Sequence, residues 1–158
     1  VLNGQLLSPA IATSSHLVLS IGGNDLLQNL SFLYEGPVDK INDAVAGVQQ
    51  YIFKPREQRF ETIIQKLSSH RANLLLCTVY EGDLGRTDEF RDVLDSSKIM
   101  VSSFNDTVYK TASKYNADVL ELRHIFTSPE DYANPIEPSH IGGEKLAQAI
   151  TDWIQKTS

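Results

Sequence analysis

Cysteine is almost absent from this chain of 158 residues, because Cys77 is the only one. A single thiol excludes an internal disulfide and a zinc site built from several cysteines. Cys77 lies inside the apolar run Leu74–Val79, and unpaired cysteines in such runs are usually buried as small apolar side chains. We therefore expect a structural thiol rather than a nucleophile.

Long apolar stretches are absent as well. None approaches the roughly 20 residues that a membrane-spanning helix needs, so we expect no membrane span. No stretch combines a cationic start with a short apolar core, which is the pattern of a signal peptide, and the sequence leaves the compartment open. No His-x-x-x-His pair indicates a metal site.

Basic residues are outnumbered, with 14 Lys and Arg against 20 Asp and Glu and a formal net charge of −6. Surfaces that bind nucleic acids or anionic membranes need clustered Lys and Arg, so the acidic balance argues against both. A neutral or cationic small molecule is the expected partner. With 41% hydrophobic and 22% charged residues, the chain fits one globular domain over residues 1–158.

Three short apolar runs, Leu17–Ile21, Leu74–Val79 and Asp118–Leu122, alternate with segments of helical apolar spacing. The alternation predicts an α/β fold with a parallel sheet and helices on both faces. The run Leu17–Ile21 suits a strand that is covered on both faces. Helical spacing is found at Leu26, Leu27, Leu30 and Leu33; at Val38, Ile41, Val45 and Val48, with Pro55 breaking the pattern; at Phe60, Ile63, Ile64 and Leu67; over 97–115; and at Leu146, Ala149, Ile150, Trp153 and Ile154.

The first informative loop is Gly22-Gly23-Asn24-Asp25, which follows the first predicted strand. Paired glycines allow a tight turn at the carboxyl end of a strand, where open α/β sheets bind ligands. Asn24 would offer an amide donor there. The same residues also form ordinary turns.

The second informative stretch is 131–143, just before the last predicted helix. Ser139 is a plausible N-cap, and Gly142 and Gly143 permit close backbone approach in the first turn. Glu137 and His140 stand three residues apart at the start of this helix. A carboxylate that orients a general base is what a serine hydrolase requires.

Both stretches resemble sequence blocks of the SGNH (GDSL-type) hydrolases. In the family's third block a strand is followed by Gly-x-Asn-Asp, matched by 22–25, and Pro138, Ser139 and Gly142 resemble its fifth block, Asp-x-x-His followed by Pro-Ser-x-x-Gly. The resemblance implies a three-layer α/β/α, flavodoxin-like fold. It also implies hydrolysis of esters of acyl groups or acetylated sugars without a metal or organic cofactor.

The resemblance assigns an oxyanion donor to Asn24, with Gly22, Gly23 and Asp25 shaping the loop. In the family, a first block supplies the serine nucleophile on the first strand, and no Gly-Asp-Ser-Leu-like segment precedes Leu17. We therefore expect the chain to lack the first strands of the fold and, with them, the nucleophile.

Two consequences follow for the first predicted strand. Ser20 falls inside it, rather than on an exposed turn, and is a weak substitute nucleophile. The missing strands would leave the apolar edge from Leu17 to Ile21 exposed, which makes it a surface for self-association.

The fifth block fits in two registers. Anchoring on Pro-Ser-x-x-Gly places Asn134 at the family's Asp position and Glu137 at its His position, so that Glu137 becomes the candidate base. Anchoring on the imidazole makes Glu137 and His140 a Glu-x-x-His pair instead. The first register keeps more matched residues, and both stay open.

The sequence thus predicts a fragment of an SGNH-type hydrolase that acts on ester bonds of a small-molecule substrate. Asn24, Glu137 and His140 are the catalytic candidates, and Asn134 and Ser139 support the fifth block. One alternative is a member that binds acyl or sugar ligands without catalysis, which the irregular fifth block favours. A weaker one is an unrelated flavodoxin-like regulatory module, since the clustered aspartates of a phospho-receiver are missing.

Overall fold

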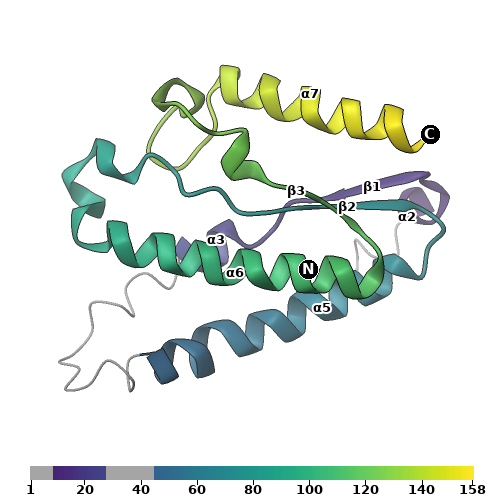
Figure 1. Cartoon of the computed structure of the whole chain (residues 1–158), viewed down its shortest axis with the longest axis horizontal. Helices are drawn as coiled ribbons and strands as arrows, with labels where there is room; N and C mark the ends of the chain where they lie inside the picture. Colours follow the sequence, from purple (N-terminus) through teal and green to yellow (C-terminus); the bar gives the residue numbers. More distant parts are fainter. Residues whose placement is uncertain (1–8, 28–44) are drawn as a thin grey trace.

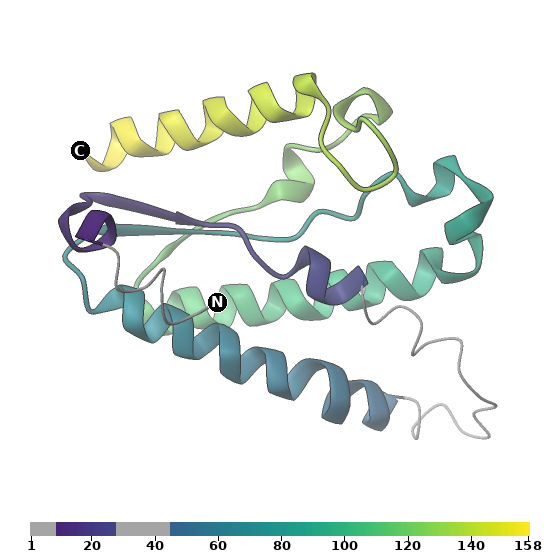
Figure 2. The ribbon, with the colours of Figure 1, turned by 180° about the vertical axis from the view of Figure 1, so that it is seen from behind.

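The computed structural model describes residues 9–27 and 45–158. Three parallel strands form its sheet in the order β1 (His16–Leu19), β2 (Asn73–Cys77) and β3 (Asp118–Leu120). Helices α5 (Lys54–Ser68) and α6 (Leu94–Tyr115) cover one face, and α7 (His140–Thr157) covers the other (Figures 1 and 2). The predicted α/β class is confirmed.

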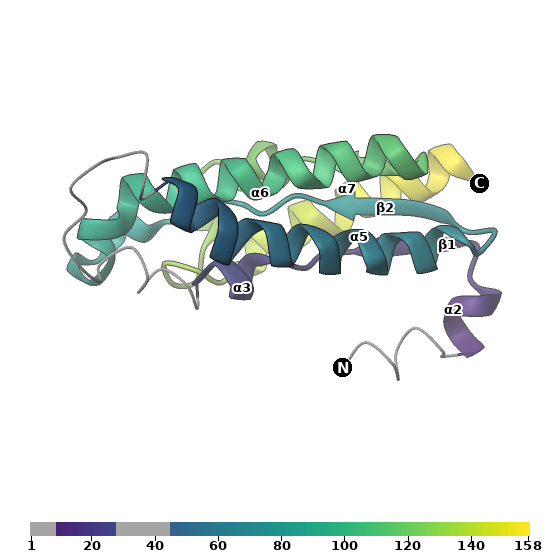
Figure 3. The same ribbon diagram turned by 90° about the horizontal axis from the view of Figure 1, so that it is seen from below.

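The central strand β2 carries the core on both of its faces. Leu74 and Leu76 are buried against the apolar sides of α5 and α6, which lie side by side below the sheet (Figure 3). Cys77 points the other way and packs with Leu122 and Phe126. Successive side chains of a strand alternate between faces, so a continuous apolar run suits a strand covered on both sides. Burial raises the pKa of the Cys77 thiol to about 11, as expected for a structural cysteine.

Strand β1 differs from the prediction in length and in burial. It ends at Leu19, so Ser20 and Ile21 follow the strand, and Val18 is 39% exposed. The expectation of cover on both faces is wrong at Val18: its partner Leu75 in the central strand is buried, but the described helices leave Val18 partly exposed in β1, which is an edge strand of the described sheet. The predicted apolar edge therefore exists at Val18 and Ile21, while self-association through it stays a prediction.

Helices α5 and α6 follow the predicted apolar stripes, whereas Val45 and Ile154, which were also predicted on apolar stripes, are exposed. Phe60, Ile64 and Leu67 of α5 are buried, and α6 buries Phe104 and Val108 among others. The chain enters α5 from a π-helical turn, η2 (Val48–Phe53), and α5 has a proline in its first turn, where no backbone N–H is needed. Pro55 therefore begins a helix rather than interrupting one. The predicted helical positions Leu30, Leu33, Val38 and Ile41 lie outside the described residues.

Short helices complete the described chain: α2 (Pro9–Thr13), α3 (Gly23–Leu27), η3 (Leu84–Arg86), η4 (Asp88–Val93), η5 (Leu122–His124) and η6 (Pro129–Asp131). The third strand was predicted over Asp118–Leu122, but β3 ends at Leu120, because Leu122 already belongs to η5. Among the described residues, no helix is long and apolar enough to cross a membrane.

Candidate functional site

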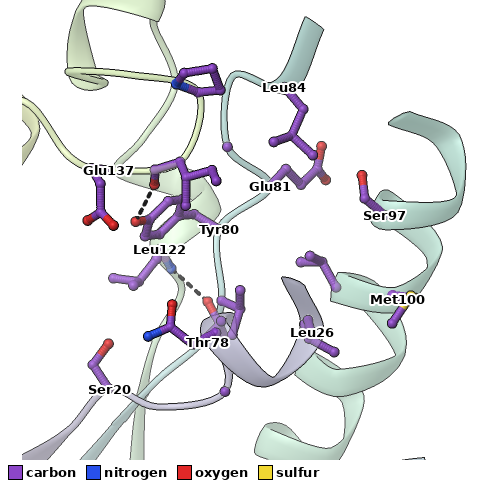
Figure 4. A pocket seen from close by; sticks show the side chains of 18 of the residues that line it. Ser20, Leu26, Thr78, Tyr80, Glu81, Leu84, Ser97, Met100, Leu122 and Glu137 are labelled. Carbon is purple, nitrogen blue, oxygen red and sulfur yellow. Dashed lines mark hydrogen bonds between the residues drawn. The ribbon is translucent and has the colours of Figure 1, made fainter. Parts of the chain in front are cut away.

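A pocket of about 750 Å³ opens where β1 and β2 end (Figure 4). Ligand-binding pockets usually have volumes of several hundred Å³, and this end of a parallel sheet is where open α/β folds place them. The lining comes from the turn after β1 (Ser20–Asn24 and Leu26), the loop after β2 (Thr78–Gly82 and Leu84), α6 (Ser97, Met100 and Val101), Leu122 of η5, and the segment Pro135–Glu137.

Gly22 makes the turn that leads from β1 into the pocket wall. Its φ of +112° is a conformation that side chains other than glycine rarely adopt, and a Cβ there would stand 2.4 Å from the Phe104 ring. The Gly22 carbonyl accepts a hydrogen bond from the Leu26 N–H at 3.1 Å, which starts α3. This turn holds Asn24 on the pocket wall with its side chain exposed. The side chain of Asp25 lies outside what the structure describes.

The segment before α7 is held by a fully buried carboxylate. Asp131 accepts hydrogen bonds from the Thr127 and Ser128 N–H groups at 2.9 and 3.0 Å, and Lys145 Nζ lies 2.6 Å from its second oxygen. The hydrogen bond from Lys145, helped by those from the two N–H groups, lowers the pKa of Asp131 although burial opposes this. The loop is therefore fixed as an ionic and hydrogen-bonded unit.

The start of α7 has the predicted cap. Ser139 accepts a hydrogen bond from the Gly142 N–H at 3.2 Å, and its hydroxyl donates to the Glu130 carbonyl at 2.6 Å. The predicted N-cap is thus confirmed. A Cβ on Gly142 would lie 2.3 Å from the Asp131 carbonyl oxygen, whereas Gly143 has open space around it. The close approach that we expected applies to Gly142 only.

Asn134 and Glu137, the pair of the first register, have different surroundings. The Asn134 side-chain oxygen accepts hydrogen bonds from the Ile136 and Glu137 N–H groups at 2.9 and 2.8 Å, so it shapes the turn and is not a lining residue. Glu137 is exposed and lines the pocket. Next to it, the Tyr80 hydroxyl donates to the Ile136 carbonyl at 2.8 Å. Desolvation and the Glu137 carboxylate raise the pKa of Tyr80.

His140 lies apart from this pair. Its side chain is 85% exposed at the start of α7, with Nε2 3.2 Å from a Glu144 oxygen one turn further along the helix. Neither His140 nor Ser139 lines the pocket, and no histidine is present in the lining that the structure describes. The structure therefore brings Asn24 and Glu137 to one pocket and leaves His140 outside it.

The pocket also contains Ser20, for which the predicted position was wrong, and Tyr80 and Glu81, which were not singled out from the sequence. Ser20 was placed within a strand, but it follows β1, is exposed and lines the pocket. Tyr80 and Glu81 belong to the polar loop after β2. The sequence could have indicated them, because this loop follows the carboxyl end of a buried strand. The Gly22 turn, which was predicted to form a site, has the same position relative to its strand.

Glu121 connects the loop after β2 to the loop after β3 through hydrogen bonds. Its carboxylate accepts a hydrogen bond from Thr78 Oγ1 at 2.8 Å and binds Arg123 through Nε and Nη2 at 2.8 and 2.7 Å. Thr78 Oγ1 in turn accepts from the Leu122 N–H at 2.8 Å (Figure 4). A partly buried hydrogen-bond network of this kind fixes the loops after β2 and β3.

Within the described part of the chain, no group of three or more His, Cys, Asp or Glu side chains could hold a metal ion. No protein-family model matches the chain, and no curated protein sequence or solved structure is significantly similar to it.

Proposed function

We propose that the pocket is the ester-binding site of an SGNH-type hydrolase with a flavodoxin-like fold. The observation that carries this proposal is that Asn24 and Glu137, from segments near opposite ends of the chain, line the same pocket at the carboxyl end of a parallel sheet. These two segments are also the ones that resemble family blocks. The substrate is a small-molecule ester, and the reaction needs no metal or organic cofactor.

In the proposed reaction a serine oxygen attacks the ester carbonyl carbon, the bond to the alcohol oxygen breaks, and the alcohol leaves with a proton. Water then hydrolyses the acyl-serine. The Asn24 amide donates a hydrogen bond to the carbonyl oxygen as negative charge develops there. The Glu137 carboxylate accepts the proton of the attacking hydroxyl or orients the group that does so. In the family this serine belongs to the first block, which has no match in residues 1–158.

The test is hydrolysis of p-nitrophenyl acetate by the natural protein that carries this sequence. We expect Asn24→Ala to lower kcat by about a hundredfold or more, the effect of removing one oxyanion donor. Asn73→Ala is the matched control, because Asn73 is exposed at the opposite end of β2. A folded protein whose turnover does not exceed the uncatalysed rate would refute the hydrolase.

The second candidate is an SGNH-fold protein that binds acyl or sugar ligands without turnover. It is favoured by His140, because the imidazole is paired with Glu144 on its own helix and does not line the pocket. Without an imidazole the acid–base step would depend on Glu137 alone. Ligand binding together with a rate no higher than that of the uncatalysed reaction would identify this candidate.

A further inference from the structure

The pocket has two chemically different parts. Its floor is made of buried apolar side chains, namely Leu26, Leu84, Met100, Val101 and Leu122. Its rim carries polar and charged groups that reach solvent, among them Glu137 and the half-buried Tyr80 and Glu81. Figure 4 shows Tyr80 and Glu137 on one side of the pocket and Leu26 and Met100 on the other. An amphiphilic ligand matches this division.

The charged residues at the described rim are all acidic. Glu81 and Glu137 line the pocket, and the described lining contains no Lys, Arg or His. Two arginines of nearby loops are bound to other carboxylates: Arg123 holds Glu121, and Arg86 Nε lies 3.2 Å from Asp83. Arg123 also lies close enough to Glu81 to interact with its charge, so Glu137 is the rim carboxylate that would repel an anionic ligand and attract a cationic one most strongly.

Tyr80 also favours a cationic ligand over an anionic one. Its hydroxyl is fixed by the hydrogen bond to the Ile136 carbonyl, so the orientation of the ring is set beside Glu137. The ring packs against Phe126 and Tyr132, with centroids 4.5 and 5.9 Å away, so an ammonium group would be attracted to the part of the ring that these two residues leave open. The negative charge of Glu137 helps to raise the pKa of Tyr80, so the carboxylate and the Tyr80 hydroxyl lie close enough to interact electrostatically.

We infer that the pocket selects cationic amphiphiles, with an aliphatic acyl chain on the apolar floor and an ammonium group at the rim beside Tyr80 and Glu137. The inference rests on the proposed function for the ester that joins these two parts. It narrows the substrate class to acyl esters whose alcohol part carries an ammonium group.

The test compares the binding of octyltrimethylammonium and octyl sulfate by calorimetry, each below its micelle concentration and at low salt. The two probes share the chain and differ in the sign of the head-group charge. We expect the cation to bind at least about tenfold more tightly, since cation–π contacts and rim carboxylates each contribute modestly at an exposed site. Glu137→Gln should reduce this ratio about threefold or more, and Glu81→Gln should reduce it less, because Arg123 lies near Glu81.

Glu130→Gln is the matched control, because Glu130 is an exposed carboxylate that does not line the pocket. It removes the same charge from a protein of net charge −6, so a ratio that falls equally in all three variants would reflect net charge and would overturn the inference. Equal binding of both probes, tighter sulfate binding or no binding of either would also overturn it. Binding with the expected preference but no ester turnover would refute the hydrolase and leave the pocket assignment standing.

Discussion

Lys145 Nζ lies 2.6 Å from the carboxylate of Asp131, whose side chain is completely buried. The other Asp131 oxygen accepts two backbone N–H groups. Asp131→Ala would leave both N–H groups and the ammonium group without this acceptor. We expect the free energy of unfolding in urea to fall by about 2–4 kcal/mol.

Asp131→Asn is the conservative control, because its amide oxygen keeps an acceptor for the two N–H groups, while the charge is lost and an NH2 donor replaces the oxygen that accepts from Lys145. This substitution should lower the free energy of unfolding by less, about 1–2 kcal/mol. If Asp131→Ala unfolds at the wild-type urea concentration, the loop before α7 does not depend on this carboxylate.

Gly22 and Gly23 form a matched pair for the turn after β1. A Cβ at Gly22 would collide with the Phe104 ring and would require a side chain at φ +112°, whereas the nearest atom to a Cβ at Gly23 is Val79 Cγ1 at 3.9 Å. Gly22→Ala should therefore destabilise the protein by about 2–3 kcal/mol, measured by thermal or urea unfolding. Gly23→Ala should change stability by less than about 0.5 kcal/mol. Similar effects of the two substitutions would contradict the described turn.

Gly142 and Gly143 provide the same comparison at α7. The alanine methyl group at position 142 would stand 2.3 Å from the Asp131 carbonyl oxygen and 2.7 Å from Phe126 Cε1. Because the first contact is with backbone, we expect Gly142→Ala to lower the free energy of unfolding by about 2–4 kcal/mol. Gly143→Ala meets no atom within 4 Å and should raise helix stability by about 0.5 kcal/mol. The packing of α7 would be refuted if Gly142→Ala were neutral.

The Glu121 network predicts a loss of stability in acid. Burial alone would raise the pKa of Glu121, but hydrogen bonds from Arg123, Tyr109 and Thr78 outweigh it and lower the pKa to about 2. The unfolded chain has a glutamate pKa of about 4.3. The carboxylate therefore stabilises the fold fully above that value, and its contribution is lost as the pH falls from about 5 toward 2.

Glu121→Gln should thus lose about 1–2 kcal/mol of unfolding free energy at pH 7, and the difference from wild type should shrink toward pH 2. Urea unfolding across this range measures it. Glu130→Gln, at an exposed position, should follow the wild-type pH dependence. If the unfolding free energy of Glu121→Gln fell between pH 7 and pH 2 as much as that of the wild type, carboxylates other than Glu121 would cause the loss of stability in acid.

Apolar patterns predicted much of the fold. The stripes of α5 and α6, the buried strand β2 and the Ser139 cap are local features that the sequence displays directly. The stripe predicted for α7 is only half-buried, and its Ile154 is exposed. The exposure of Val18 in β1 could not be predicted from the same pattern, because burial depends on the position of the strand in the sheet and on which helices cover that part of the face. The two registers of the fifth block stayed open for a related reason. Residue spacing alone does not decide which side chain faces the pocket, and the structure places Glu137 there and His140 on the outside of α7.

The rim residues Tyr80 and Glu81 come from the loop after β2, while Glu137 comes from the segment before α7. Their proximity depends on how β2 and β3 pair and on the loop that Asp131 holds. Such long-range pairings leave no periodic signal in the sequence. The Thr78–Glu121 hydrogen bond was not predicted for the same reason.

The most direct measurement is the effect of Asn24→Ala on catalysis and binding in the same protein. The natural protein that carries this sequence is assayed for hydrolysis of p-nitrophenyl acetate and for binding of octyltrimethylammonium. We predict that kcat falls by about a hundredfold, because an oxyanion donor acts in the transition state, while the dissociation constant of the probe changes by less than about threefold. An unchanged kcat in the folded variant would contradict the assignment of this pocket as an ester-hydrolysing site.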